Sequence, residues 1–91
     1  MTLDFAKFET VEQAQKAAGE VFPPGKTTRS EVEKVLESWH VKLHSHGANI
    51  LNAKIILPSQ NLVHTVWMIR FEFNPNSTLT TMIVSKGFTG P

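Results

Sequence analysis

The chain has 91 residues, of which 41% are hydrophobic and 19% charged, a balance typical of a small folded domain rather than a disordered segment. Its formal charge is only +1, from nine basic and eight acidic residues, so the composition indicates no cationic surface for nucleic acid or an anionic membrane. The absence of cysteine excludes disulfides, thiolate metal ligands and cysteine nucleophiles.

The first segment, residues 1–20, predicts a short helix with a small apolar side. Thr10 has the position of an N-cap and Gln13 follows three residues later, which is the spacing of a capping box. Small apolar residues then recur at helical spacing: Val11, Ala14 and Ala18. Because such a stripe buries little area, the helix needs anchors, and Phe5 and Phe8 are the candidates. Gly19 is expected to end the pattern.

Residues 28–46 contain the most regular helical pattern, and it predicts a main helix over about 28–45. Thr28 and Glu31 have the spacing of a second capping box, directly after an extended Pro/Gly link at residues 21–27. Apolar residues then lie at i, i+3, i+4, i+7 and i+11 and form one stripe: Val32, Val35, Leu36, Trp39 and Leu43. Gly47 is expected to close the helix in a left-handed conformation.

Residues 48–86 predict three strands. The first carries apolar residues at the alternate positions 51, 53, 55 and 57, and residues 58–61 then form a turn. The second, from Val63 to Phe73, has the strongest alternation in the chain, with Trp67 on its wholly apolar side. A turn at 74–77 leads to the third, Leu79 to Lys86, and residues 87–91 form a tail.

These elements predict one α+β domain over residues 1–91, in the order helix, helix, strand, strand, strand. Short turns make neighbouring strands antiparallel, so the sheet is expected to be a three-stranded meander. The Trp67 side of the second strand is the expected floor for the main helix. That packing would bury Trp39 and Trp67 near one another.

The opposite side of the sheet is the predicted interaction face, because it is too apolar for a solvated surface. In the third strand the pattern leaves open either Met82 and Val84 or Leu79 and Ile83. The predicted face consists of Ile50, Ile56, Val66, Met68, Arg70, Met82 and Val84. Its cover is expected to be the N-terminal helix, a second copy in a homodimer, or another protein partner.

A histidine-rich flank of the main helix supports an alternative function. Glu37, His40 and His44 lie at i, i+3 and i+7, and His46 follows, so three imidazoles and a carboxylate could hold zinc or a similar metal. The alternative is therefore a metal- or small-ligand-binding sensor or enzyme. Polar residues also belong beside an apolar stripe, and the helix dipole favours histidines near a C-terminus. We favour the reading without a metal or cofactor.

Other chemistry is poorly represented. Gly25-Lys26-Thr27 matches the end of a phosphate-binding loop, but Glu20 stands where the first glycine is required. No Gly-x-Ser-x-Gly elbow is present and Asp4 is the only aspartate, so no catalytic residues are expected.

A double-stranded-RNA-binding domain needs a second helix after its strands, so RNA binding is not expected. The chain as given is expected to carry neither a signal peptide nor a membrane span.

The stretch from Pro24 through Val32 to Leu36 resembles a helix start found in small bacterial lipoproteins that accompany outer-membrane β-barrel assembly. It is also similar to related domains with the β-lactamase-inhibitor-protein fold. The resemblance implies a helix-rich N-terminal part packed on a short antiparallel sheet, a protein-binding role and an exported, periplasmic location. The chain has no lipid-bearing cysteine, and its valine lies one residue further from the glycine than is usual in those families.

Overall fold

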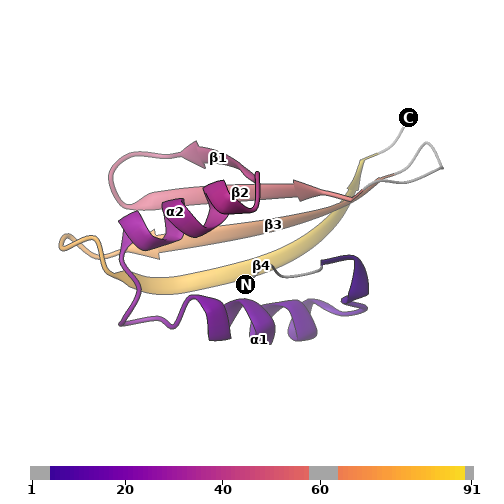
Figure 1. The fold of residues 1–91 in the computed structure, drawn as a ribbon, viewed down its shortest axis with the longest axis horizontal. Helices are drawn as coiled ribbons and strands as arrows, with labels where there is room; N and C mark the ends of the chain where they lie inside the picture. The colour runs from indigo at the N-terminus through magenta and orange to yellow at the C-terminus, as the bar shows by residue number, and fades with distance from the viewer. Residues whose placement is uncertain (1–4, 58–63, 90–91) are drawn as a thin grey trace.

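The computed structural model describes residues 5–57 and 64–89. Within them a short 3-10 helix, η1 (Phe5–Lys7), precedes two α-helices, α1 (Val11–Val21) and α2 (Arg29–Ser38). Four strands follow: β1 (Lys42–Ser45), β2 (Ile50–Ile56), β3 (His64–Phe73) and β4 (Leu79–Thr89). They form one antiparallel sheet in the order β1-β2-β3-β4 (Figure 1). The α+β class is confirmed, but the described sheet has four strands where the sequence predicted three.

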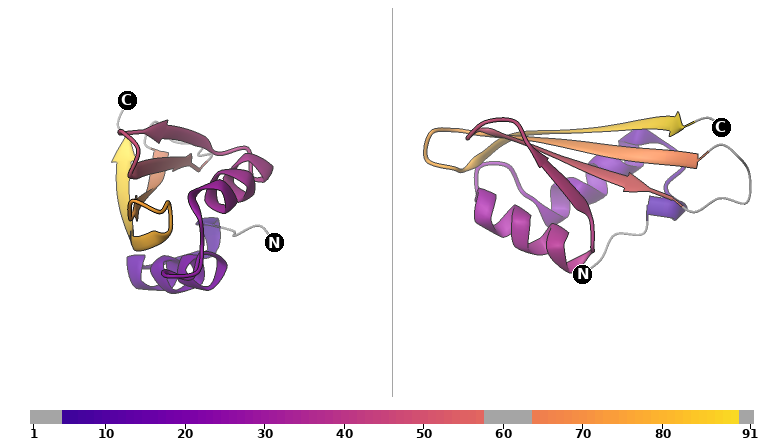
Figure 2. Two further views of the ribbon diagram at one scale, coloured as in Figure 1. Left: turned by 90° about the vertical axis from the view of Figure 1, so that its left-hand side faces the viewer. Right: turned by 90° about the horizontal axis from the view of Figure 1, so that it is seen from above.

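Both helices lie on the same side of the sheet (Figure 2). α1 runs beside β4, while α2 lies over the β1–β2 end (Figure 1). The core between these layers includes Phe22, Leu36, Trp67 and Phe71, each at most 1% exposed. The Trp67 side of β3 is thus the floor beneath the helices, as the alternation predicted.

The predicted helix starts are confirmed in both cases. The Thr10 side chain accepts from the Gln13 backbone N–H, and the Gln13 side chain returns a bond to the cap's backbone. Thr28 and Glu31 make the same reciprocal pair at the start of α2. Each box pairs backbone N–H groups that a helix start would otherwise leave unpaired. α1 continues through Gly19 to Val21, so the prediction that Gly19 ends it was wrong.

The main helix is shorter than predicted. α2 ends at Ser38, and His40 has a left-handed backbone with φ of 58°. The His40 N–H bonds to the Glu37 carbonyl and the Val41 N–H to the Leu36 carbonyl, which is the pattern of a Schellman motif. Residues 42–45 then pair with β2 as β1. The prediction of a helix over 28–45 closed by Gly47 was therefore wrong, because backbone pairing across the sheet replaces the last two helical turns.

Replacing His40 with glycine is expected to stabilise the fold by roughly 0.5–1 kcal/mol, because a left-handed backbone is strained for a residue with a Cβ. Urea unfolding of the variant against the parent chain measures this change. Ser38→Gly, inside α2, is the matched control and should destabilise by a similar amount. If the helix continued through residue 40, His40→Gly would destabilise instead, so the sign of the change tests the helix end.

The two tryptophans belong to one core but have different aromatic neighbours. Trp39, partly buried, packs its ring on Phe22 at 5.8 Å between centroids. Trp67 is fully buried and packs on Phe5 at 5.8 Å and Phe8 at 6.3 Å. Phe5 and Phe8 are thereby confirmed as anchors of the N-terminal segment.

A bulge fixes which residues of β4 face the core. The register between β3 and β4 shifts at Glu72/Phe73, so that Phe73 pairs with Leu79 while Phe71 pairs with Met82. Because of this shift, Leu79 and Met82 both face the helices although they are three residues apart. β4 also continues through Thr89, so the predicted tail at 87–91 begins inside the strand.

Arg29 connects the start of α2 to the β1–β2 turn. Its guanidinium donates to the Ala48 carbonyl at 2.6 Å and to the Ser45 hydroxyl at 2.8 Å, and its Nε pairs with Glu33 at 2.9 Å. The same group lies 6.0 Å from the centre of the Phe73 ring. These charge-assisted hydrogen bonds fix the position of the short strand β1 relative to α2. Packing of β1 alone would hold it only weakly, because one side of the strand is polar.

Candidate interaction face

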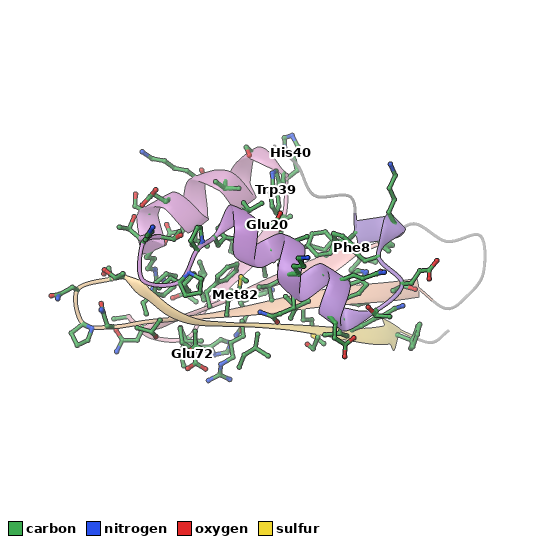
Figure 3. The ribbon with its side chains drawn as sticks, turned by 90° about the horizontal axis from the view of Figure 1, so that it is seen from below. Phe8, Glu20, Trp39, His40, Glu72 and Met82 are labelled. Carbon is green, nitrogen blue, oxygen red and sulfur yellow. The ribbon has the colours of Figure 1, made fainter. Side chains whose placement is uncertain are left out.

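The side of the sheet turned away from both helices is the candidate site, and we call it the open face. Residues that alternate with the buried core positions form it, so its members follow directly from strand register. On β1 and β2 they are Lys42, His44, Ile50, Asn52, Lys54 and Ile56; on β3 and β4 they are Val66, Met68, Arg70, Glu72, Thr81, Ile83, Ser85 and Gly87. Figure 3 shows the two sides: Met82 lies between α1 and the sheet, and Glu72 points away from the helices.

Large apolar side chains are exposed on the open face. Ile56 is 56% exposed, Met68 42% and Ile83 48%. Val66 pairs with Ile56 on β2 and is 3% exposed, although it is outside the core cluster beneath the helices. A Cβ at Gly87 would lie 3.7 Å from the Met68 Cε, an ordinary contact distance, so the methionine tip lies beside Gly87 of β4. We call Ile56 on β2, Met68 on β3 and Ile83 on β4 the apolar strip, because these exposed side chains lie on the same face of three neighbouring strands.

The structure corrects the β4 contribution to the predicted face. Met82 and Val84, 7% and 4% exposed, belong to the core beneath the helices, so their assignment to the interaction face was wrong. Ile83 takes their place, opposite Arg70 on β3. Five predicted residues do lie on the open face: Ile50, Ile56, Val66, Met68 and Arg70. The N-terminal helix does not cover them, because Phe5, Ala14 and Ala18 are buried on the other side of the sheet.

Basic residues border the apolar strip on its β1–β2 side. Lys42 and Lys54 are directly paired across these strands, both exposed, and Lys54 is in turn paired with Met68. Arg70 extends the basic group onto β3 and donates through Nε to Glu72 at 2.9 Å. Like charges placed directly opposite one another destabilise a sheet, so the Lys42–Lys54 pair is unfavourable in the isolated chain.

The free edge of β4 is blocked in its middle by α1. Gln15 donates from Nε2 to the Met82 carbonyl and accepts at Oε1 from the Val84 N–H, both at 2.8 Å. The two backbone groups belong to alternate residues of an edge strand, so both point away from β3. One glutamine amide therefore occupies the positions that an added strand would pair with.

The alternative histidine site does not form as predicted. Glu37 lies in α2, His40 ends that helix in the left-handed conformation, and His44 lies on β1, so the helical spacing of the three is lost. His46 follows β1, in the turn to β2, where its backbone N–H bonds to the Ile50 carbonyl. Residues 5–57 and 64–89 contain no group of three or more His, Cys, Asp or Glu residues arranged to hold a metal ion.

The predicted turn at 58–61, the predicted start of the central strand at Val63, Asp4, and the last two residues of the predicted tail lie outside the described residues. The turn at 74–77 is confirmed, with the Asn74 side chain accepting from the Asn76 and Thr78 backbone N–H groups. Within the described ranges, the helices are too short and too polar to span a bilayer.

Comparison of the chain with protein-family models, with curated proteins and with solved structures found no match.

Proposed function

We propose that this chain is a small non-catalytic protein-binding module whose open face receives a protein partner. The observation that carries the proposal is the strip of exposed apolar side chains at Ile56, Met68 and Ile83, on the side of the sheet turned away from both helices. Contiguous apolar patches on small proteins are typical of interaction sites. The flanking charges of Lys54 and Arg70 give the patch the polar border that protein interfaces usually have.

The face is favoured over the sheet edges as the binding surface. β1 is only four residues long, and short edge strands are poor templates for strand addition. At β4, Gln15 already occupies the backbone groups of Met82 and Val84. The open face, in contrast, presents three strongly exposed large hydrophobic side chains, Ile56, Met68 and Ile83. The proposal includes a relationship to the lipoprotein and inhibitor families named above, because those families also bind proteins. It therefore also includes an exported location.

Photo-crosslinking at Met68 tests the proposal. A chain with p-benzoylphenylalanine in place of Met68 is expected to form an adduct with a defined host protein, identifiable by mass spectrometry. The same substitution at Lys16, exposed on α1, is the matched control and should give no adduct. Adding Ile83→Glu should abolish the adduct at position 68, because a carboxylate in an apolar contact is costly to desolvate. Absence of an adduct, or equal adducts at both positions, would contradict the proposal.

Sedimentation at several concentrations decides whether the partner is a second copy. If the open face forms a homodimer, the parent chain will self-associate and Met68→Glu with Ile83→Glu will return it to monomer. These two positions suit the test because both side chains are already more than 40% exposed, whereas Val66 is 3% exposed and its replacement by glutamate would disturb the fold. A strictly monomeric parent chain would exclude the homodimer version while leaving a different partner.

A further inference from the structure

We infer that the partner segment held by the open face is an amphipathic helix with an acidic flank, supplied by another protein. This inference rests on the proposed function and adds the chemistry of the partner. Three observations carry it: the distribution of charge over the fold, the position of basic side chains beside exposed apolar ones on the open face, and the dimensions of the face.

Acidic residues are concentrated in the part of the chain that precedes β1. Residues 42–91 contain four of the nine basic residues but only one of the eight acidic residues, Glu72. Glu72 is bound to Arg70 on the same face. The remaining described acidic residues all precede β1, in or beside the helices: Glu9, Glu12, Glu20, Glu31, Glu33 and Glu37. Lys86 lies against the Trp67 ring on the helix side of the sheet. The open face thus has three basic residues, Lys42, Lys54 and Arg70, against one acidic residue, so it is net positive and an acidic partner complements it.

The open face offers both kinds of surface that an amphipathic helix needs. Lys42 and Lys54 stand side by side on β1 and β2, and their mutual repulsion would be relieved by a carboxylate placed between them. Met68 on β3 and Ile83 on β4 supply apolar surface that a helical stripe would cover, and Ile56 adds to it on β2. The partner helix is expected to lie along the strands with its acidic flank toward β1.

The size of the face favours a single helix over a second copy of this chain. β3 and β4 have 10 and 11 residues, so at about 3.4 Å per residue the face is roughly 35 Å long, and four strands about 4.8 Å apart make it roughly 15–20 Å wide. A helix is about 10 Å wide and 14 residues span roughly 20 Å, so one helix fits along the strands. A second copy joined face to face would instead bring two net-positive faces together.

The test uses three synthetic 14-residue helical peptides that share one leucine stripe and differ only in the flanking residues, which are Glu, Gln or Lys. Fluorescence anisotropy with the full chain is expected to show at least about tenfold tighter binding of the Glu peptide than of the Lys peptide, with the Gln peptide between them. The preference should shrink between 50 and 500 mM NaCl, because these charges are exposed and screened by salt.

Charge reversal supplies the matched controls. Lys42→Glu with Lys54→Glu should invert the peptide preference, whereas Lys16→Glu with Lys34→Glu, the same charge change on the exposed sides of α1 and α2, should leave it unchanged. Met68→Ser with Ile83→Ser should weaken all three peptides by similar factors. A 20-nucleotide single-stranded RNA and phosphatidylglycerol vesicles are expected to bind more weakly than the Glu peptide.

Each contrary result overturns the inference. Equal binding of the three peptides, no binding of any, preference for the Lys peptide, or tighter binding of RNA or vesicles would each exclude an acidic helix as the occupant. The outcome is separable from the proposed function. If Met68 crosslinks a host protein but Lys42→Glu with Lys54→Glu has no effect, only the acidic-helix inference fails; if Met68 crosslinks nothing, the proposed function fails.

Discussion

Trp67→Ala is expected to lower the free energy of unfolding by about 3–5 kcal/mol, the range for removing a buried aromatic side chain. Trp67 is fully buried and packs on Phe5 and Phe8, and the Lys86 ammonium lies 5.3 Å from the centre of its ring. Its loss would therefore detach η1 from the sheet as well as open a cavity. A chain of this size has a total stability of roughly 5–10 kcal/mol, so the variant would lose at least about a third of it.

Trp67→Phe separates the packing from the indole N–H. The Trp67 Nε1 is buried without a hydrogen-bond partner in the described part of the chain. Removing that donor offsets some of the lost volume, so this variant is expected to cost less than half as much as Trp67→Ala. Urea unfolding followed by far-UV circular dichroism measures both. A loss below about 1 kcal/mol for Trp67→Ala would show that the ring does not fill the core as described.

Gln15→Leu is expected to lower the free energy of unfolding by about 1–3 kcal/mol and to make the chain self-associate. Both effects have one cause. The Met82 carbonyl and the Val84 N–H would lose their only partner across the free edge of β4 that the structure describes, and leucine cannot replace either bond. An edge strand with unpaired backbone groups is a template for pairing with another chain.

The control for this variant is Lys16→Leu, which adds the same apolar side chain at an exposed neighbouring position of α1. It should change stability by no more than about 0.5 kcal/mol, as surface substitutions usually do. Thermal unfolding gives the stability of both variants, and light scattering against concentration gives their association. If Gln15→Leu remains monomeric at the highest concentration, the glutamine contributes stability without protecting the edge.

Local signals in the sequence were sufficient for the helix starts and for the central strand. Thr10 with Gln13, and Thr28 with Glu31, form capping boxes from residues three apart, so the information is contained in a few neighbouring positions. The alternation around Trp67 and Phe71 likewise identifies the buried side of β3. Both features depend on residues that are close in the sequence, so contacts with distant segments do not easily change them.

The sequence of β1 contains a strand pattern, but the prediction gave more weight to a helical pattern over the same residues. Val41 and Leu43 are apolar and alternate with Lys42 and His44, which is a period of two, but Leu43 also completes the helical stripe at i+11. The strand pattern and the helix pattern overlap over so few residues that local sequence preference cannot distinguish a strand from a helix there. Pairing of residues 42–45 with β2 and the contacts of Arg29 with the β1–β2 turn decide the outcome.

By itself the sequence determined the α+β class, the two capped helices, and the apolar side of β3 on which they pack. Tertiary structure alone decided that both helices share one side, that a bulge turns Met82 inward and Ile83 outward, and that Gln15 occupies the edge of β4. The physical reason is the distance along the chain between the residues that interact. Caps and alternation involve residues a few positions apart, whereas face coverage, register and edge protection depend on contacts between segments distant in the chain, such as Gln15 with Met82 and Val84.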